Sequence, residues 1–190
     1  FVGRRAMDIE GVGEKLIEQL VDRGMVENPA DLYHRLDKAS LAGMERMADK
    51  SAQNVIDSIQ RSRDMDLARF VFALGIPGVG EEVAKILARH FGTLQAMLAA
   101  DWAALEADKA ALRKDNARRK RKGEALQAVP LEGIGPEIME SIDKFMHERH
   151  NREVIARLID PARGISLKDA GTGKAAAGGK TFVLTGTLPG

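Results

Sequence analysis

A short glycine turn that runs directly into an amphipathic stretch occurs three times in the chain. The copies span residues 9–17, 76–87 and 131–139, and each opens with the pattern apolar-x-Gly-apolar-Gly. A degenerate fourth copy, at residues 44–52, has Arg and Ala in place of the two glycines. The last turn residues fall at positions 13, 48, 80 and 135, so the spacings are 35, 32 and 55 residues. Such a repeat predicts one structural unit used four times.

The residue types of this turn suit the binding of a phosphate. Glycine adopts positive φ without a steric penalty and lets bare backbone approach a partner closely. The second glycine opens a helix, whose first N–H groups lack intrahelical acceptors and lie at the positive end of the helix dipole. Such a site binds an anion and does not distinguish bases. The apolar residue inside each turn is expected to point into the core: Val12, Met47, Val79 and Ile134.

The turn has two other interpretations. A dinucleotide-binding fingerprint requires a third glycine after a strand, but the corresponding residues are Leu16, Val83 and Ile138. This interpretation is rejected. A plain helix–helix turn without a ligand stays open for any single copy, but three intact copies with the same flanks favour a shared binding role.

The composition favours packed helices. Of the 190 residues, 44% are apolar but only 4% are aromatic. A formal net charge of +1 does not indicate nucleic-acid binding in bulk, so any such binding depends on local charge placement. The absence of cysteine excludes a disulfide framework and a cysteine-based zinc site within these residues. No apolar run approaches about 20 residues and no signal peptide is visible, so we expect a cytoplasmic protein with no membrane contact.

Capping residues mark the expected helix starts. Met and Phe residues at helical spacings between these starts are expected to be core. Each expected start precedes an apolar helical pattern, and the starts are Asn28 with Pro29, Ser40, Asp49, Asp66, Thr93, Asp101 and Asn151.

Residues 107–127 differ in amino-acid composition from the rest of the chain. They contain the basic run 113–122 and lie in the longest gap between repeats. The run could extend a helix that starts at Trp102. Two interpretations stay open here: a solvated, mobile insertion, or an extra arm that touches phosphates and steepens the salt dependence of binding.

The last residues predict a tether and a strand. Residues 170–179 are rich in Gly and Ala, as in flexible linkers. A phosphate-binding loop is rejected there because position 174 is Lys and no strand precedes it. Residues 180–188 predict a strand that opens a second, truncated domain. Because the chain also begins inside a motif without Met, we expect an excised fragment.

No catalytic constellation is found. His147 and His150 share a helical face with Glu148 between them, but the His-Glu-x-x-His pattern and a third ligand are absent. No serine lies in a nucleophile-elbow context. We therefore expect this chain to bind rather than react, with no catalytic and no metal-binding residue.

The hairpin units resemble the helix-hairpin-helix motif of DNA-binding proteins, and the chain as a whole resembles the C-terminal part of bacterial NAD-dependent DNA ligases. The stretches that carry this resemblance are residues 4–15, 30–33, 50–54, 74–76 and 180–188. The resemblance implies an all-α fold with four helix-hairpin-helix units in two pseudo-symmetric pairs. It also implies three regions: a helix-hairpin-helix domain at 1–163, a flexible linker at 164–179, and the first strand of a BRCT domain at 180–190.

The same resemblance implies where the chemistry of the parent enzyme would lie. The adenylation domain, the NAD-binding region, an oligonucleotide-binding fold and a zinc module would all precede residue 1, as partners in cis. The parent would join a 3′-hydroxyl to a 5′-phosphate in replication and repair, using NAD and magnesium. The fragment should be inactive alone and monomeric, and a monovalent cation at a hairpin stays open. Pro77-Gly78 replaces the Arg-His common in such ligases, and the charged stretch after the third unit is longer than usual.

The predicted mechanism is a clasp around nicked double-stranded DNA, held by phosphates on the minor-groove side. Pro136 lacks a backbone N–H donor, so the fourth hairpin should offer phosphate fewer hydrogen bonds than the others. The predicted DNA-binding residues are Arg4, Arg5, Gly11, Val12, Gly13, Lys15, Arg46, Met47, Ala48, Lys50, Gly78, Val79, Gly80, Lys85, Gly133, Ile134 and Gly135.

The sequence has two competing functional interpretations. One is an architectural or protein-interaction module without DNA contact, which the near-neutral charge slightly favours. The other is a nuclease or recombination factor with the same hairpins, which the terminal strand after a tether disfavours.

Overall fold

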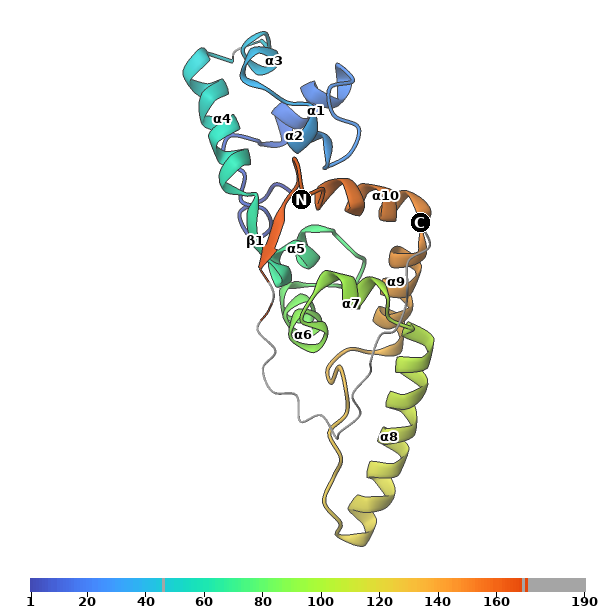
Figure 1. Cartoon of the computed structure of the whole chain (residues 1–190). Helices are drawn as coiled ribbons and strands as arrows, with labels where there is room; N and C mark the ends of the chain where they lie inside the picture. The colour runs from blue at the N-terminus through green and yellow to red at the C-terminus, as the bar shows by residue number, and fades with distance from the viewer. Residues whose placement is uncertain (46, 169, 171–190) are drawn as a thin grey trace.

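The computed structural model describes residues 1–45, 47–168 and 170, and the chain is mostly helical within them (Figure 1). The helices are α1 (Glu14–Asp22), α2 (Asp31–His34), α3 (Lys38–Ala42), α4 (Asp49–Arg61), α5 (Leu67–Ala73), α6 (Glu81–Phe91), α7 (Leu94–Leu98), α8 (Trp102–Lys122), α9 (Pro136–His147) and α10 (Arg149–Leu158). Two short strands are β1 (Asp64–Asp66) and β2 (Ser166–Lys168). The helical fold is confirmed, and the strand predicted at 180–188 lies outside the described residues.

The helices form two connected parts with one projecting arm. Figure 1 shows α1–α4 at one end, α5–α7 and α9 in the middle, and α10 beside the junction between them. Helix α8 packs against α9 at its base and then extends away from the body, as a continuous helix through the basic run. The predicted extension of the helix from Trp102 is thus confirmed.

A buried carboxylate joins the first part to α10. Asp31 in α2 is only 2% exposed, and its carboxylate accepts hydrogen bonds from Arg157 Nη2 at 2.7 Å and from Glu27 N at 2.9 Å. Burial acts to raise the pKa of Asp31, but the hydrogen bonds and the charge of Arg157 outweigh it, so the pKa lies below its usual value. This cluster fixes α10 against the first part.

The two strands form a small parallel pair that the sequence did not indicate. Asp64 pairs with Ser166 and Asp66 with Lys168. The Arg63 guanidinium reinforces the pairing by donating to the carbonyls of Arg163, Gly164 and Tyr33. The linker predicted from residue 164 therefore differs from the structure in its first residues: the folded domain extends to at least Lys168, because β2 has a partner strand about 100 residues earlier.

Several caps are as predicted and others are displaced. Thr93 and Asp101 cap α7 and α8 through their side chains. Ser40 is not the cap of α3: Asp37 is, and Ser40 completes its capping box. Helix α10 likewise begins at the cap Glu148, whose carboxylate accepts from Asn151 N, so the predicted cap at Asn151 is wrong by three positions.

The predicted cap of α2 is wrong, whereas the predicted core is largely right. Asn28 does not cap α2, which begins after Ala30; its side chain instead accepts from Ala30 N in a local turn. The expected methionine and phenylalanine core is largely confirmed. Six methionines and Phe70 are buried in one continuous cluster, and Met25 and Met47 pack against it half-buried.

Candidate nucleic-acid interface

Three glycine turns share one backbone geometry. We call them hairpin 1 (residues 9–13), hairpin 3 (76–80) and hairpin 4 (131–135). Their first glycines have φ of +80° at Gly11, +80° at Gly78 and +89° at Gly133. In each, the N–H of the next residue donates to the carbonyl three residues before it, at 3.0–3.4 Å. Positive φ at the third position of such a turn favours glycine, which explains why the pattern recurs.

The degenerate copy keeps part of this geometry. In hairpin 2 (residues 44–48), Met47 N donates to Met44 O at 3.2 Å. Ala48 then opens α4 with extended backbone, as Gly13, Gly80 and Gly135 open α1, α6 and α9. Arg46, predicted as a side-chain partner, lies outside the described residues.

The four hairpin helices begin without side-chain caps. No side-chain oxygen accepts from the first N–H groups of α1, α4, α6 or α9. By contrast, α3, α7, α8 and α10 are capped by an Asp, Thr or Glu side chain. The short α2 and α5 also lack caps, but no glycine turn precedes them. The hairpins therefore present free donors in the way an anion site requires.

The hairpin corners lie at the surface while their central side chains are buried. Five of the six predicted glycines are exposed and Gly135 is half-buried. Val12, Val79 and Ile134 are 4%, 6% and 0% exposed, as predicted for residues that pin the turn to the core. Met47, in the degenerate copy, is half-buried.

Hairpins and helices interlock in pairs. A Cβ built on Gly78 would lie 3.3 Å from Ile138 in α9, and one on Gly133 would lie 3.6 Å from Ile86 in α6. Hairpins 3 and 4 thus each pack against the helix that follows the other. Hairpin 1 packs in the same way against α4, where a Cβ on Gly11 would lie 2.9 Å from Val55. This exchange relates hairpins 3 and 4 as a pair, and hairpin 1 with α4 as another.

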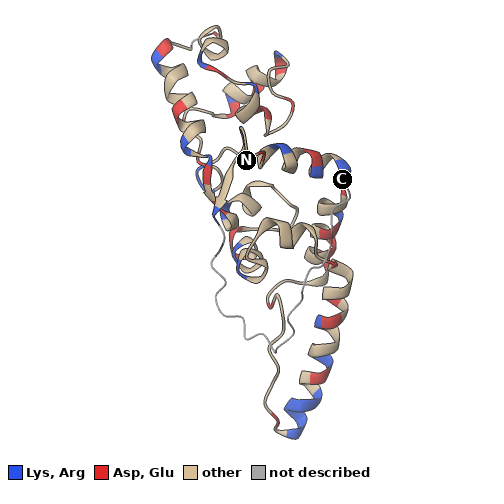
Figure 2. Ribbon diagram, viewed as in Figure 1, with Lys and Arg blue, Asp and Glu red and all other residues tan. Residues whose placement is uncertain are grey.

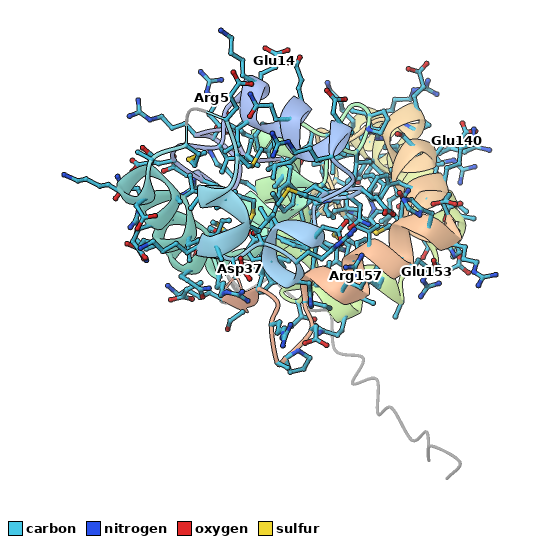
Figure 3. All side chains as sticks on the ribbon, turned by 90° about the horizontal axis from the view of Figure 1, so that it is seen from above. Arg5, Glu14, Asp37, Glu140, Glu153 and Arg157 are labelled. Atoms are coloured by element: carbon cyan, nitrogen blue, oxygen red, sulfur yellow. The ribbon has the colours of Figure 1, made fainter. Side chains whose placement is uncertain are left out.

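Two basic side chains tie the N-terminal segment to α5 and α6. Arg5 Nη1 lies 3.4 Å from Glu81 Oε1, which joins the N-terminal segment to the first residue of α6. Arg69 donates to the carbonyls of Arg4 and Ala6 and so fixes this segment. Figure 3, viewed from above, shows Arg5 and Glu14 at the same edge of the molecule.

The remaining predicted cations are exposed but differ in their pairing. Lys85 Nζ lies 2.6 Å from Glu82 Oε1, and this hydrogen bond lowers the pKa of Glu82. Arg4, Lys15 and Lys50 are exposed, with no ion pair among the described residues. These three can turn toward a ligand without breaking an ion pair.

Family comparisons match this architecture. The SAM-like helix-hairpin-helix tandem family matches residues 4–61, and the helix-hairpin-helix motif family matches residues 69–107. The whole chain aligns with a DNA ligase of Alkalilimnicola ehrlichii at 42% identity. The chain thus contains helix-hairpin-helix motifs and is similar along its whole length to part of a DNA ligase. It spans 25% of the length of that ligase.

One residue that supports hairpin 4 was not predicted from the sequence. Lys109 in α8 is 0% exposed, and its ammonium donates to the carbonyls of Leu131 at 2.8 Å and of Ile134 in hairpin 4. Burial lowers the pKa of Lys109, and the nearby Arg113 adds to this effect. The signal was its register: Lys109 follows Trp102 and Leu105 at helical spacing, on the inward face of α8.

Two further features were sought in the side chains and helices of the described residues. None of the described groups of His, Cys, Asp and Glu could hold a metal ion. Within the same residues, no helix is both long and apolar enough to span a membrane.

Proposed function

We propose that this domain binds duplex DNA through its phosphates and helps to hold a nicked duplex for sealing by a NAD-dependent DNA ligase. The observation that carries the proposal is the recurrence of uncapped, exposed glycine corners with the same backbone geometry. An N–H group that donates to a phosphate oxygen positions the protein without reading sequence. The binding is therefore sequence-independent, and the 42% identical DNA ligase supports DNA as the ligand.

Paired hairpins suit a double helix better than a single strand. The interlocked hairpins 3 and 4 present two phosphate-sized corners on one rigid support, held by Ile138 and Ile86. Two such pairs would contact both backbones across the minor groove, with the protein as a monomer. Hairpin 4 has Pro136 at the first helical position, which removes one donor, so it would contribute least.

The chemistry of sealing would belong to other parts of the parent protein. We propose that an adenylation domain with its NAD-binding region, an oligonucleotide-binding fold and a structural zinc module precede this chain. The parent would use NAD and magnesium, and a monovalent cation at a hairpin stays a prediction. The role of this domain would be to clamp the substrate, so that alone it would bind but not seal.

Gly80→Val tests the proposal. Gly80 has a negative φ and a Cβ there would meet nothing within 4 Å, so the substitution adds bulk at the exposed corner without strain at its Cβ. The expected result is weaker binding to a random-sequence nicked duplex and a flatter salt dependence, because a phosphate contact is lost. Binding is measured by fluorescence anisotropy across salt, with thermal unfolding to confirm the fold.

Ala99→Val is the matched control, since it adds the same side-chain type at the exposed end of α7. It should bind as the wild type does. Unchanged affinity and salt slope for Gly80→Val would remove hairpin 3 from the interface.

One observation favours the architectural alternative. The first turns of α1, α4, α6 and α9 each contain an acidic residue, which neutralises the helix dipole and repels phosphate. If the domain only oriented its neighbours, no salt-dependent shift of any duplex would be seen in a gel. A shift that weakens with added salt would exclude this alternative.

A further inference from the structure

Positive charge is segregated into the outer part of α8. Residues 113–122 contain seven Lys and Arg and one Asp, whereas the whole chain has a formal net charge of only +1. The remainder of the chain is therefore net negative. Figure 2 shows the cations gathered at the far end of the projecting helix, away from both hairpin pairs. This uneven distribution indicates a binding surface for a polyanion, because a charge placed only for solubility has no need to cluster.

Most of these cations are free to bind. We call the arm residues 110–127, and its tip cations are Arg113, Lys114, Arg118, Lys120, Arg121 and Lys122. All six are exposed. Among the described residues only Arg119 of the basic run forms ion pairs, with Asp115 at 2.9 Å and Glu124 at 3.8 Å. Arg119 is therefore structural, whereas the six tip cations face solvent.

The returning segment braces the arm. Gly123 ends α8 with φ of +70°, and the chain then runs back along the helix. The Asn116 side chain and the Gln127 backbone exchange two hydrogen bonds, each of 2.8 Å. Arg119 adds a hydrogen bond to Ala125 O at 3.2 Å. The arm therefore consists of the end of α8 and a returning segment that is hydrogen-bonded to it. This differs from the mobile insertion that was one interpretation of the sequence.

The base of the arm is fixed to hairpin 4. The buried Lys109 ammonium holds the carbonyls of Leu131 and Ile134, which are part of the turn itself. The arm is therefore anchored at its base to hairpin 4, and α8 continues from there without a break to Lys122. Lys109 and Lys122 are separated by 13 residues of continuous helix, which corresponds to about 20 Å.

We propose that the arm is a second duplex-binding surface, whose tip cations contact phosphates beyond the stretch of DNA held by the hairpins. The proposal rests on the proposed function, since the interlocked hairpins 3 and 4 together set where the duplex lies. A reach of about 20 Å corresponds to about six base pairs of duplex. Phosphate is favoured over an acidic protein face because residues 110–127 contain no aromatic residue, and protein interfaces rely on aromatic anchors.

The test neutralises three tip cations in the full chain: Lys120→Gln, Arg121→Gln and Lys122→Gln together. Binding is measured by anisotropy on random-sequence duplexes of about 12 and about 30 base pairs, from about 50 to about 200 mM salt. A longer duplex offers more overlapping binding positions, which alone raise the apparent affinity. The wild type should bind the longer duplex more tightly than this statistical gain explains. The triple variant should lose this gain, and its salt slope on the longer duplex should fall by about 2 to 3, or about 0.9 for each contact removed.

The matched control removes the same charge elsewhere: Lys144→Gln, Arg149→Gln and Arg152→Gln on α9 and α10. It should keep the length-dependent gain, which excludes an effect of net charge alone. If the tip variant and the wild type bind both duplexes with equal salt dependence, the proposal is overturned. The arm would then be a candidate site for an acidic protein surface instead.

Failure of the proposed function would look different. In that case the wild type would bind neither duplex in a salt-dependent way, and Gly80→Val would change nothing. If Gly80→Val lost binding and the tip variant had no effect, only the proposal for the arm would be overturned.

Discussion

The two hairpin pairs use the same turn but hold it in different ways. In the first pair, hairpin 1 packs so closely on α4 that a Cβ at Gly11 would lie 2.9 Å from Val55, and Ser58 Oγ accepts from Glu10 N at 2.7 Å. In the second pair the apolar approaches are looser, and Ser141 Oγ instead donates to Pro77 O at 2.8 Å. Hairpin 4 is further braced by the buried ammonium of Lys109.

This difference shows that the turn geometry is what the sequence repeat preserves, while the support is assembled locally. In both pairs two further helices lie between the first hairpin's helix and the second hairpin, α2 and α3 in the first pair and α7 and α8 in the second. The first pair relies on a tight apolar contact between hairpin 1 and α4. In the second pair a buried charge from the intervening helix α8 adds to the support. The comparison predicts different sensitivities in the two pairs.

The largest difference is expected between Gly11→Ala and Gly133→Ala. Both force a side chain onto positive φ, but only the first also drives a Cβ to 2.9 Å from a neighbouring side chain, against 3.6 Å in the second. The conformational strain alone should destabilise either variant by about 1–3 kcal/mol, and overpacking should add about 1–3 kcal/mol at Gly11. Urea unfolding measures both, and equal losses would show that the first pair is no more tightly packed than the second.

Lys109→Met should have the next largest effect, confined to the second pair. Methionine fills similar space but leaves the carbonyls of Leu131 and Ile134 without their donor, which should lower the free energy of unfolding by about 1–3 kcal/mol. Hydrogen exchange should then speed up in hairpin 4 but not in hairpin 1. Lys114→Met, on the exposed surface of the same helix, is the control. Uniform loss of protection in both hairpins would contradict a local brace.

The smallest effect concerns the contact that joins the first part to α10. The pKa of Asp31 is lowered in the folded state, so the folded protein holds this proton less tightly than the unfolded chain. The stability it contributes is present above the ordinary aspartate pKa and is lost as the pH falls through the lowered value. Arg157→Leu removes the main partner and should lose about 0.5–1.5 kcal/mol near pH 7, because the Arg157 side chain is 42% exposed and solvent screens part of the interaction, with a smaller further loss on acidification.

Urea unfolding at pH 7 and near pH 3 checks this expectation. Arg149→Leu removes an exposed ion pair with Glu153 and should leave the stability nearly unchanged. An Arg157→Leu variant with the acid sensitivity of the wild type would show that Asp31 does not couple the two parts.

Local features of the fold could be predicted, and contacts between distant segments could not. The glycine turns followed from backbone stereochemistry at Gly11 and Gly78, and the caps Thr93 and Asp101 needed only the following three residues. Ser40 was mistaken for a cap because both members of a capping box, Asp37 and Ser40, are good capping residues.

The missed features share a different cause. The pairing of β1 with β2 joins segments about 100 residues apart, and each strand is too short to show a periodic pattern. The role of Lys109 depends on carbonyls that carry no side-chain signal. The hairpin residues of the site could thus be predicted from the sequence, whereas the brace behind hairpin 4 required the structure.

The most direct test compares backbone amide signals of capped and uncapped helices by NMR during titration with duplex DNA. The first-turn amides after hairpins 1 and 3, at Glu14 and Glu81, should shift as phosphate binds. The amides of Ser40, Ala96 and Ala104 already donate to side-chain caps and should stay in place. If the duplex bound while the hairpin amides stayed unchanged, the glycine corners would not be the phosphate sites.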